Sequence, residues 1–450
     1  MIISVYEMKK LDLTKGNITK TMIAFALPMI LGNLLQQMYN IADTLIVGRA
    51  LGSGALAAVG SAYALMTFLT SVLLGLCMGS GAVFSICWGE KNTEKLKSAI
   101  FTSFVLTALL TVVLNIVVFI FMDNILLLLN VPEEIYGLMR AYVQIIFWGI
   151  GFVFLYNFFA ALLRAVGNSV IPLIFLAVCA VLNIVLDLYF VLGCQWGVSG
   201  AAAATVISQA VSGIGIGIYT WITQPKLRPA AKNCRIESTL LKEMAQFSLL
   251  TSLQQSVMNL GILMVQGLVN SFGTAVMAAF AAAVKIDSFA YMPVQDFGNA
   301  FSTFIAQNYG AGKKERIEKG IKKAVMIAII FCLCVSFVVC FFAKPLMLLF
   351  VDAGETAILN IGVQYLRIEG AFYCGIGCLF LLYGYYRAVG KPGMSVVLTV
   401  ISLGTRVVLA YVLSALEPVG VTGIWWSVPI GWFLADLVGF MYYRKSRRLV

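Results

Sequence analysis

Two aspartates lie inside stretches of the chain that are otherwise apolar. Asp43 ends a polar helix face whose other members recur at spacings of three and four, namely Asn33, Gln36, Gln37 and Asn40. In a second apolar stretch Asn183 and Asp187 stand four residues apart, which stacks them on one helix face, and a third stretch carries Thr205. An aspartate at the centre of a membrane helix costs about 2.5–3.5 kcal/mol on insertion scales, so aspartates that persist there require a reason.

These side chains have the chemistry of a cation site. Two carboxylates in one water-poor cavity repel each other and lose hydration, so such a pair favours uptake of a proton near neutral pH. The same oxygens, with an asparagine amide oxygen and a threonine hydroxyl, could instead hold Na⁺. We expect one cation-coupling cavity, with H⁺ and Na⁺ both open, formed by Asp43, Asn183, Asp187 and Thr205. The alternative is hydrogen bonding between helices, worth about 0.6–2 kcal/mol per contact, which suffices for asparagines and glutamines taken singly.

The second half of the chain carries a different set of charges. Lys285 and Asp287 lie together in one apolar stretch and most simply neutralise each other, so we expect a structural charge pair. Arg406 and Asp436 are isolated, and an ion pair between them is an open alternative. Polar, aromatic and methionine side chains that could line a cavity for a bulky compound are Gln36, Tyr39, Asn40, Asn157, Gln254, Met258, Tyr291 and Met292.

The apolar stretches that hold these residues are long enough to cross a membrane. Hydrophobic residues make up 61% of the chain and charged residues 11%, whereas a soluble domain has about 25% charged residues. About 20 apolar residues span a bilayer as a helix. Hydropathy predicts twelve spans, near 21–47, 54–86, 99–122, 138–162, 170–192, 199–222, 245–271, 275–305, 324–343, 364–386, 394–415 and 423–443. The expected fold is an all-α polytopic membrane protein with 12 transmembrane helices.

The second half of the sequence repeats the first. Leu51-Gly52 recurs as Phe272-Gly273 at an offset of 221, and Arg164-Ala165-Val166-Gly167 recurs letter for letter at 387–390, an offset of 223. Six spans in each half return the chain to its starting side, so two six-helix lobes should be related by a pseudo-twofold axis along the membrane normal. The lobes are expected over 21–223 and 244–443, joined by a linker over 224–243.

Basic residues indicate the orientation of the chain. With the N-terminus in the cytoplasm, 25 of the 31 lysines and arginines fall on the cytoplasmic side, most of them in the N-tail 1–20, the linker, the loop 307–323 and the C-tail 444–450. We therefore expect a multi-pass monomer of the plasma membrane with both termini in the cytoplasm. Topology and contact with anionic lipid then explain the net charge of +11 without a nucleic-acid partner.

Residue types also exclude several functions. Histidine is absent, which excludes a His-based metal site or proton relay. The stretch Gly310–Lys314 superficially suggests a phosphate loop, but Gln307 and Lys314 stand where that motif needs Gly and Ser or Thr. We therefore expect that the protein is not an enzyme and has no cofactor. Any active transport must draw on an ion gradient or on a separate subunit.

Several motifs together resemble the multidrug and toxic compound extrusion (MATE) family. They are Pro28-Met29-Ile30, Asn40-Ile41-Ala42-Asp43, Gly48-Arg49, Ala57-Ala58-Val59-Gly60, Asn308-Tyr309-Gly310-Ala311-Gly312 and the two Arg-Ala-Val-Gly copies. The resemblance covers essentially the whole chain, and the combination is specific. It implies a V-shaped pair of six-helix lobes that exchange inward- and outward-facing states.

The resemblance also implies a function and a site. Family members export amphipathic, often cationic compounds against entry of H⁺ or Na⁺. The family's N-lobe cation site is matched by Asp43, Asn183, Asp187 and Thr205. One branch also uses acidic residues on spans 7 and 10. Here span 7 offers Gln254 and Gln255, and span 10 only Glu369 near its start, which favours a resemblance to the DinF-type branch.

We expect a cation-coupled antiporter that exports bulky amphipathic, cationic organic compounds by alternating access. The runner-up is a flippase of related fold for a lipid or lipid-linked precursor, which predicts a groove lined by basic residues; the interior offers only Lys285 and Arg406. A major-facilitator-type transporter predicts a Gly-x-x-x-Asp-Arg-type motif between spans 2 and 3, where the chain reads Cys87-Trp88-Gly89-Glu90-Lys91-Asn92. A non-transporting scaffold leaves Asp43 and Asp187 unexplained.

Overall fold

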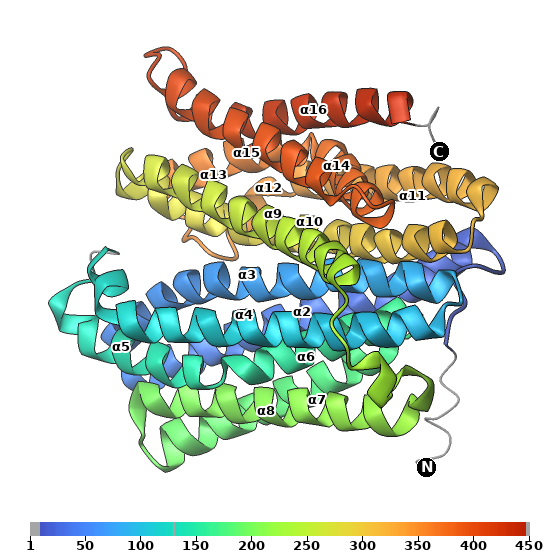
Figure 1. The fold of residues 1–450 in the computed structure, drawn as a ribbon. Coiled ribbons are helices and arrows are strands. Elements are labelled where there is room, and N and C mark those ends of the chain that lie inside the picture. Colours follow the sequence, from blue (N-terminus) through green and yellow to red (C-terminus); the bar gives the residue numbers. More distant parts are fainter. Residues whose placement is uncertain (1–9, 129–130, 447–450) are drawn as a thin grey trace. The chain divides into compact units, whose positions relative to one another are not determined.

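The computed structural model describes residues 10–128 and 131–446, and every regular element in that part of the chain is helical. Within these described residues, ten helices are long and apolar enough to cross a membrane, and the number rises to 12 if each of two bent helix pairs is one span. The expected all-α multi-pass membrane fold is thereby confirmed (Figure 1). The first nine residues of the predicted N-tail and the last four of the C-tail lie outside the described residues.

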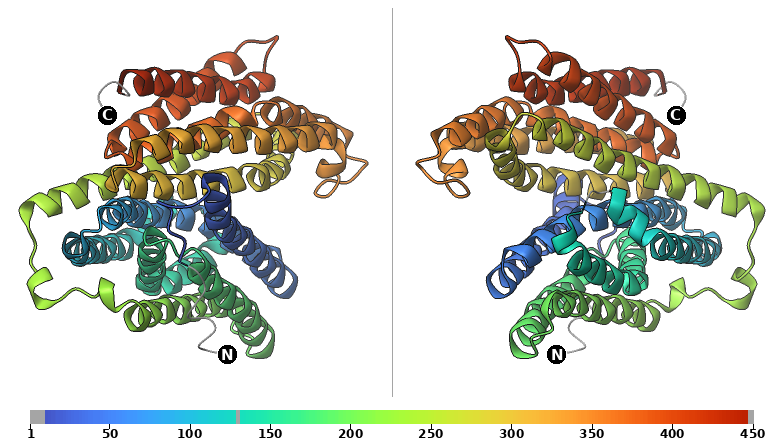
Figure 2. Two further views of the ribbon diagram at one scale, coloured as in Figure 1. Left: turned by 90° about the vertical axis from the view of Figure 1, so that its right-hand side faces the viewer. Right: turned by 90° about the vertical axis from the view of Figure 1, so that its left-hand side faces the viewer.

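The helices divide between two compact units (Figures 1 and 2). Among the residues that the structure describes, the first unit comprises 10–13 and Leu27–Ser252, and the second comprises Thr14–Ala26 and 253–446. Helices of the first half of the chain are α2 (Ile18–Leu51), α3 (Ser53–Gly89), α4 (Thr93–Leu128), α5 (Glu133–Trp148), α6 (Ile150–Ala165), α7 (Val170–Asp187) and α8 (Gly197–Thr223). Those of the second half are α9 (Ser238–Asn270), α10 (Thr274–Gly310), α11 (Lys314–Phe341), α12 (Ala343–Met347), α13 (Thr356–Gly370), α14 (Tyr373–Ala388), α15 (Pro392–Ser414) and α16 (Val421–Ser446).

The unit boundaries differ from those of the predicted lobes, 21–223 and 244–443. They fall inside α2 and α9, so the first turns of α2 cluster with the second unit and the first turns of α9 cluster with the first. The predicted linker, 224–243, also belongs to the first unit, where it contains two short 3₁₀ turns, η2 (Pro225–Leu227) and η3 (Ala231–Asn233).

The duplication is visible in the backbone. Several positions with positive φ in the first half have a counterpart with positive φ in the second half. The pairs are Gly52 and Gly273 (φ 85° and 95°), Lys91 and Gly312 (57° and 68°), Gly167 and Gly390 (89° and 79°), and Gly197 and Gly420 (62° and 50°). Because this region of φ strongly favours glycine, agreement at these positions indicates that the same turns are built twice.

Spans 4 and 10 are bent at equivalent places in the two halves. α5 and α6 meet at Gly149 with a bend of 47°, and α13 and α14 meet across 371–372 with a bend of 51°. A methyl group on Gly149 would lie 2.7 Å from Val206 Cγ2, so the missing side chain lets α8 approach the bend.

The first turns of α9 cross α3 at backbone contact distance within the first unit. Gly75 and Gly79 of α3 stand one helical turn apart, and a methyl group on either would come within 2.3 Å of a backbone atom of α9. The hydroxyls of Ser252 and Ser248 on α9 form hydrogen bonds to α3 over 3.0 and 2.9 Å. Small and hydroxyl-bearing residues are the ones that let membrane helices pack this closely.

Candidate ion-coupling site

Gly32 of α2 faces Leu176 of α7. A methyl group on Gly32 would lie 3.4 Å from Leu176 Cδ2, so the two helices are in van der Waals contact here. Asp43 and Asp187 each follow this contact by 11 residues on their own helix. The carboxyl groups of Asp43 and Asp187 also interact, so two contacts 11 residues apart on each helix show that α2 and α7 run in the same direction.

The carboxyl groups of Asp43 and Asp187 lie close enough to interact with each other. The Tyr142 hydroxyl of α5 interacts electrostatically with both carboxyl groups, and Tyr39 of α2 interacts with Asp43. Asp187 is 0% exposed, whereas Asp43 is half-buried. One member of the pair is therefore in the protein interior, and the other retains access to the surface of the first unit.

Asn183 and Thr205 complete the cluster. Asn183 precedes Asp187 by one turn, and its Nδ2 donates a hydrogen bond to Thr205 Oγ1 of α8 over 3.3 Å. The Thr205 hydroxyl in turn donates to the Ala201 carbonyl over 3.1 Å. Directly after Asp187 the chain changes to a π-helical turn, η1 (Leu188–Gly193). Such turns within α-helical segments are frequent at functional sites.

Several buried oxygens of this cluster have no hydrogen-bond partner among the residues that the structure describes. They are Oδ1 and Oδ2 of Asp187, Oδ1 of Asp43 and Oδ1 of Asn183. A buried polar atom without a partner costs about 1–3 kcal/mol, so the arrangement favours a bound species that satisfies these atoms. Because the ligand set consists of oxygen alone, it suits a proton or a hard cation such as Na⁺.

The structure thus brings together all four residues that the sequence singled out for cation coupling. Asp43 meets Asp187, and Asn183 meets Thr205. Sequence reasoning missed Tyr142, which is one of 18 tyrosines in the chain and stands in no motif that marks it. The coupling role of the cluster stays a prediction.

A second buried cluster lies in the second unit. The Tyr373 hydroxyl of α14 donates a hydrogen bond of 2.6 Å to Asp287 Oδ1 of α10. Glu369 of α13 is 1% exposed and interacts with Asp287, with the Tyr365 hydroxyl and with the Arg406 guanidinium of α15. Arg406 also interacts with Asp287. This cluster therefore contains two carboxyl groups and a guanidinium that offsets part of their charge.

The second cluster corrects expectations drawn from the sequence. The predicted pair of Lys285 and Asp287 is not formed: Lys285 is exposed, whereas Asp287 is buried beside Tyr373. Residues two apart on a helix do not face each other, which explains the separation. Arg406 interacts with the cluster carboxyls and, in the described part of the chain, forms no ion pair with Asp436. Span 10 contributes Glu369 as a fully enclosed carboxyl, although the sequence places it only near the start of that span.

The residues predicted to line a substrate cavity are divided between the units. The first unit holds Gln36, Tyr39, Asn40 and Asn157, and the second holds Gln254, Met258, Tyr291 and Met292. Tyr39 interacts with Asp43, and Tyr291 interacts with Asp287, so each unit has one of these aromatics beside its carboxyl cluster. The Asn157 amide donates to the Val153 carbonyl of its own helix over 2.9 Å. A cavity-lining role for the eight residues stays a prediction.

Comparisons with known proteins agree with this architecture. The family model MatE matches residues 28–189 and 248–412. The chain is 32% identical over 444 residues to "Probable multidrug resistance protein YpnP" of Bacillus subtilis (strain 168), with 98% of each chain covered. It is 26% identical over 440 residues to "Multidrug export protein MepA" of Staphylococcus haemolyticus, with 97% of this chain and 95% of that protein covered.

Solved structures share the fold. One described as "Outward-facing conformation of a multidrug resistance MATE family transporter of the MOP superfamily" has a TM-score of 0.91 at 24% identity and covers 97% of each chain. Another, described as "Crystal structure of MATE in the bent conformation", has a TM-score of 0.90 at 24% identity, again over 97% of each chain.

A duplicated, multi-pass helical fold with a buried carboxyl cluster in each unit is that of a membrane transporter and not of an enzyme. The two matches of the family model cover most of the chain, one in each half. The chain belongs to the MatE family, the multidrug and toxic compound extrusion transporters.

Proposed function

We propose that the protein is a cation-coupled antiporter that exports bulky, amphipathic, cationic organic compounds across the plasma membrane by alternating access. The observation that carries the coupling is the Asp43–Asp187 cluster with its unpartnered oxygens. Relatives named as multidrug resistance and multidrug export proteins support the substrate class. H⁺ or Na⁺ is the coupling ion, and no further cofactor takes part.

The cluster can couple an ion to a conformational change because its charge depends on occupancy. With an ion bound, Asp187 no longer repels Asp43, and burial of the cluster is less costly. With the ion released, the two carboxylates favour a conformation that admits water. If the substrate binds best to the conformation that the ion disfavours, ion entry drives substrate export.

The proposal places the protein nearest the DinF-type branch of the family. The cluster of the first unit is complete, whereas span 7 carries Gln254 and Gln255 where the other branch has an acidic residue. The second-unit carboxyls come from spans 8 and 10, which is a different combination from the pair on spans 7 and 10.

The first prediction concerns Asp187→Asn, which keeps the shape of the side chain and removes its titratable group. In proteoliposomes, export of a cationic dye driven by a pH or Na⁺ gradient should fall at least about fivefold, to the rate without a gradient. Dye binding at equilibrium should change far less, since the dye need not touch the carboxylate. The matched control is Asp123→Asn on α4, an exposed carboxylate paired with Arg140 at 2.7 Å, which should transport normally.

Gradient-driven export at the normal rate by Asp187→Asn would show that the coupling site lies elsewhere. The runner-up function is tested in the same vesicles with a fluorescent phospholipid. Translocation of the lipid without export of the dye would identify the protein as a flippase, and the antiporter proposal would fail.

A further inference from the structure

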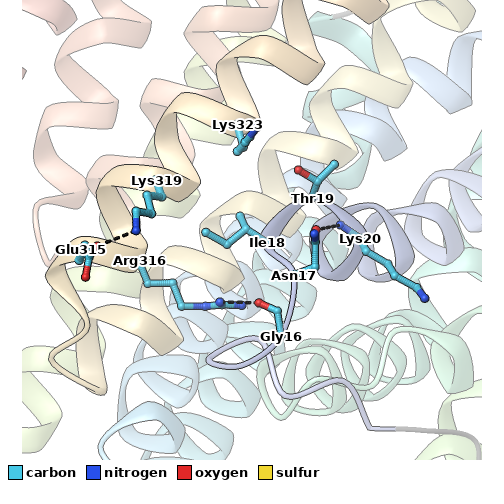
Figure 3. Close-up of a pocket in the computed structure, with 9 residues that line it drawn as sticks. All are labelled: Gly16, Asn17, Ile18, Thr19, Lys20, Glu315, Arg316, Lys319 and Lys323. Atoms are coloured by element: carbon cyan, nitrogen blue, oxygen red, sulfur yellow. Dashed lines mark hydrogen bonds and ion pairs between the residues drawn. The ribbon is translucent and has the colours of Figure 1, made fainter.

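A basic pocket lies beside the start of α2, entirely within the second unit (Figure 3). Its volume is about 760 Å³. Two segments line it: Gly16–Lys20, where α2 begins, and one face of α11, which contributes Glu315, Arg316, Lys319 and Lys323. The lining thus carries a lysine on α2 and three cationic side chains on α11 against one carboxylate.

Hydrogen bonds from the Arg316 side chain to main-chain carbonyls hold the pocket wall in place. The Arg316 guanidinium donates to the carbonyls of Gly16 and Lys15 over 2.7 and 2.6 Å, and it lies 5.4 Å from the centre of the Phe304 ring. These contacts fix the turn that leads into α2 against α11. The geometry of the pocket is therefore set before any ligand arrives.

The remaining charges of the lining favour an anion. Lys319 pairs with Glu315 over 2.6 Å, whereas Lys20 and Lys323 form no ion pair with any residue that the structure describes. The first turn of α2 adds the positive end of a 34-residue helix, with Asn17 accepting a hydrogen bond from the Lys20 backbone N–H over 3.1 Å. A phosphate group matches both features, because it accepts hydrogen bonds and carries negative charge.

The surface next to the pocket is apolar and faces outward. Along α11, Lys319 and Lys323 are followed on the same helix face by Met326 and Ile330, which are 45% and 55% exposed. On α2, Lys20 is followed one turn later by Ile23, 44% exposed. In a membrane helix, such a change from cations to exposed apolar side chains marks the depth of the lipid headgroups.

We propose that this pocket binds the phosphate group of an anionic phospholipid, with the acyl chains along Ile23, Met326 and Ile330. Basic pockets between helices on the cytoplasmic side are suited to anionic headgroups. Assignment to the cytoplasmic leaflet rests on the orientation that the basic residues predict, with both termini in the cytoplasm. The chemistry of the pocket does not depend on that orientation.

The test measures phospholipid binding to the purified full-length chain in detergent by native mass spectrometry. The lipids are dioleoylphosphatidylglycerol and dioleoylphosphatidylcholine. A lysine near an anionic headgroup contributes about fivefold in affinity, so Lys323→Gln should weaken binding of the anionic lipid by about that factor. Lys322→Gln is the matched control, because this neighbouring lysine is exposed and outside the lining, and it should bind as the parent does.

Two further variants and a competition experiment with inorganic phosphate complete the test. The double variant Lys319→Gln/Lys323→Gln should lose more affinity, and Lys323→Arg should retain it. The proposed site is wrong if Lys322→Gln and Lys323→Gln lose equal affinity for the anionic lipid, or if the parent protein binds both lipids equally. If inorganic phosphate displaces the bound anionic lipid as strongly as added anionic lipid does, the lipid assignment is wrong. Because binding is measured without a gradient, failure here leaves the proposed transport function untouched.

Discussion

Charge partners give the two buried carboxyl clusters different chemistry. The other side chains of the first cluster are uncharged, namely Asn183, Thr205, Tyr39 and Tyr142. In the second unit, Arg406 offsets part of the negative charge of Asp287 and Glu369, and Tyr373 donates to Asp287. The first cluster is therefore the one whose charge a mobile ion must balance, which is why the proposed coupling rests on it.

The second prediction separates the partner that the structure gives Asp287 from the one suggested by the sequence. Tyr373→Phe removes the 2.6 Å hydrogen bond to a buried carboxyl and should cost about 1–2 kcal/mol. That cost corresponds to a fall of several degrees in the apparent melting temperature of the purified protein, about 2–4 °C per kcal/mol for a unit of this size. Lys285→Gln should leave the melting temperature unchanged, because Lys285 is exposed. A larger fall in melting temperature for Lys285→Gln than for Tyr373→Phe would instead support the Lys285–Asp287 pair.

At the residue scale, the sequence predicts the first cluster better than the second. Asp43 and Asp187 stand alone among apolar residues, and spacing places Asn183 on the face of Asp187. The partners of Asp287 come from α13, α14 and α15, and no local pattern joins residues so far apart in the chain. Proximity in sequence suggested Lys285 instead, although a helix turns that side chain to another face.

The crossing of α3 and α9 carries the third prediction, at the scale of helices. Gly79→Val should destabilise the first unit, because even a methyl group there would come within 2.3 Å of a backbone atom of α9. Overpacking of this kind costs about 1–3 kcal/mol or more, and the measurement is the yield and melting temperature of the purified protein. Gly151→Val on α6 is the control, since no heavy atom lies within 4 Å of an added Cβ there. Equal melting temperatures for the two variants would contradict the close crossing.

Hydropathy predicts the candidate spans but not the breaks inside two of them. The predicted span at 138–162 is two helices that meet at Gly149, and the span at 364–386 is two helices that meet across 371–372. Periodicity cannot reveal these bends, because the helices on both sides are apolar and proline is absent from both breaks. At the first break Val206 of α8 packs against Gly149, a tertiary contact that the local sequence does not reveal.

At the scale of the whole molecule, the sequence repeat identifies the duplication but not the unit boundaries. Repeated motifs fix which spans correspond, and the family model matches each half separately. The boundaries inside α2 and α9 depend on which neighbours the first turns of these helices contact. For α9 those contacts include the glycines of α3, which hydropathy counts only as apolar residues.

The last prediction concerns the orientation of the whole chain. Cys234 is exposed in the linker between η3 and α9, and the linker is expected in the cytoplasm because it is rich in basic residues. A membrane-impermeant maleimide should therefore label Cys234 in inverted membrane vesicles and not in intact cells. Cys334 is also exposed, but it lies within the apolar stretch of α11, where a water-soluble reagent should not reach it. Cys234→Ser should abolish the labelling. Labelling of Cys234 in intact cells would place the basic loops outside, and the pocket at the start of α2 would then face the outer leaflet.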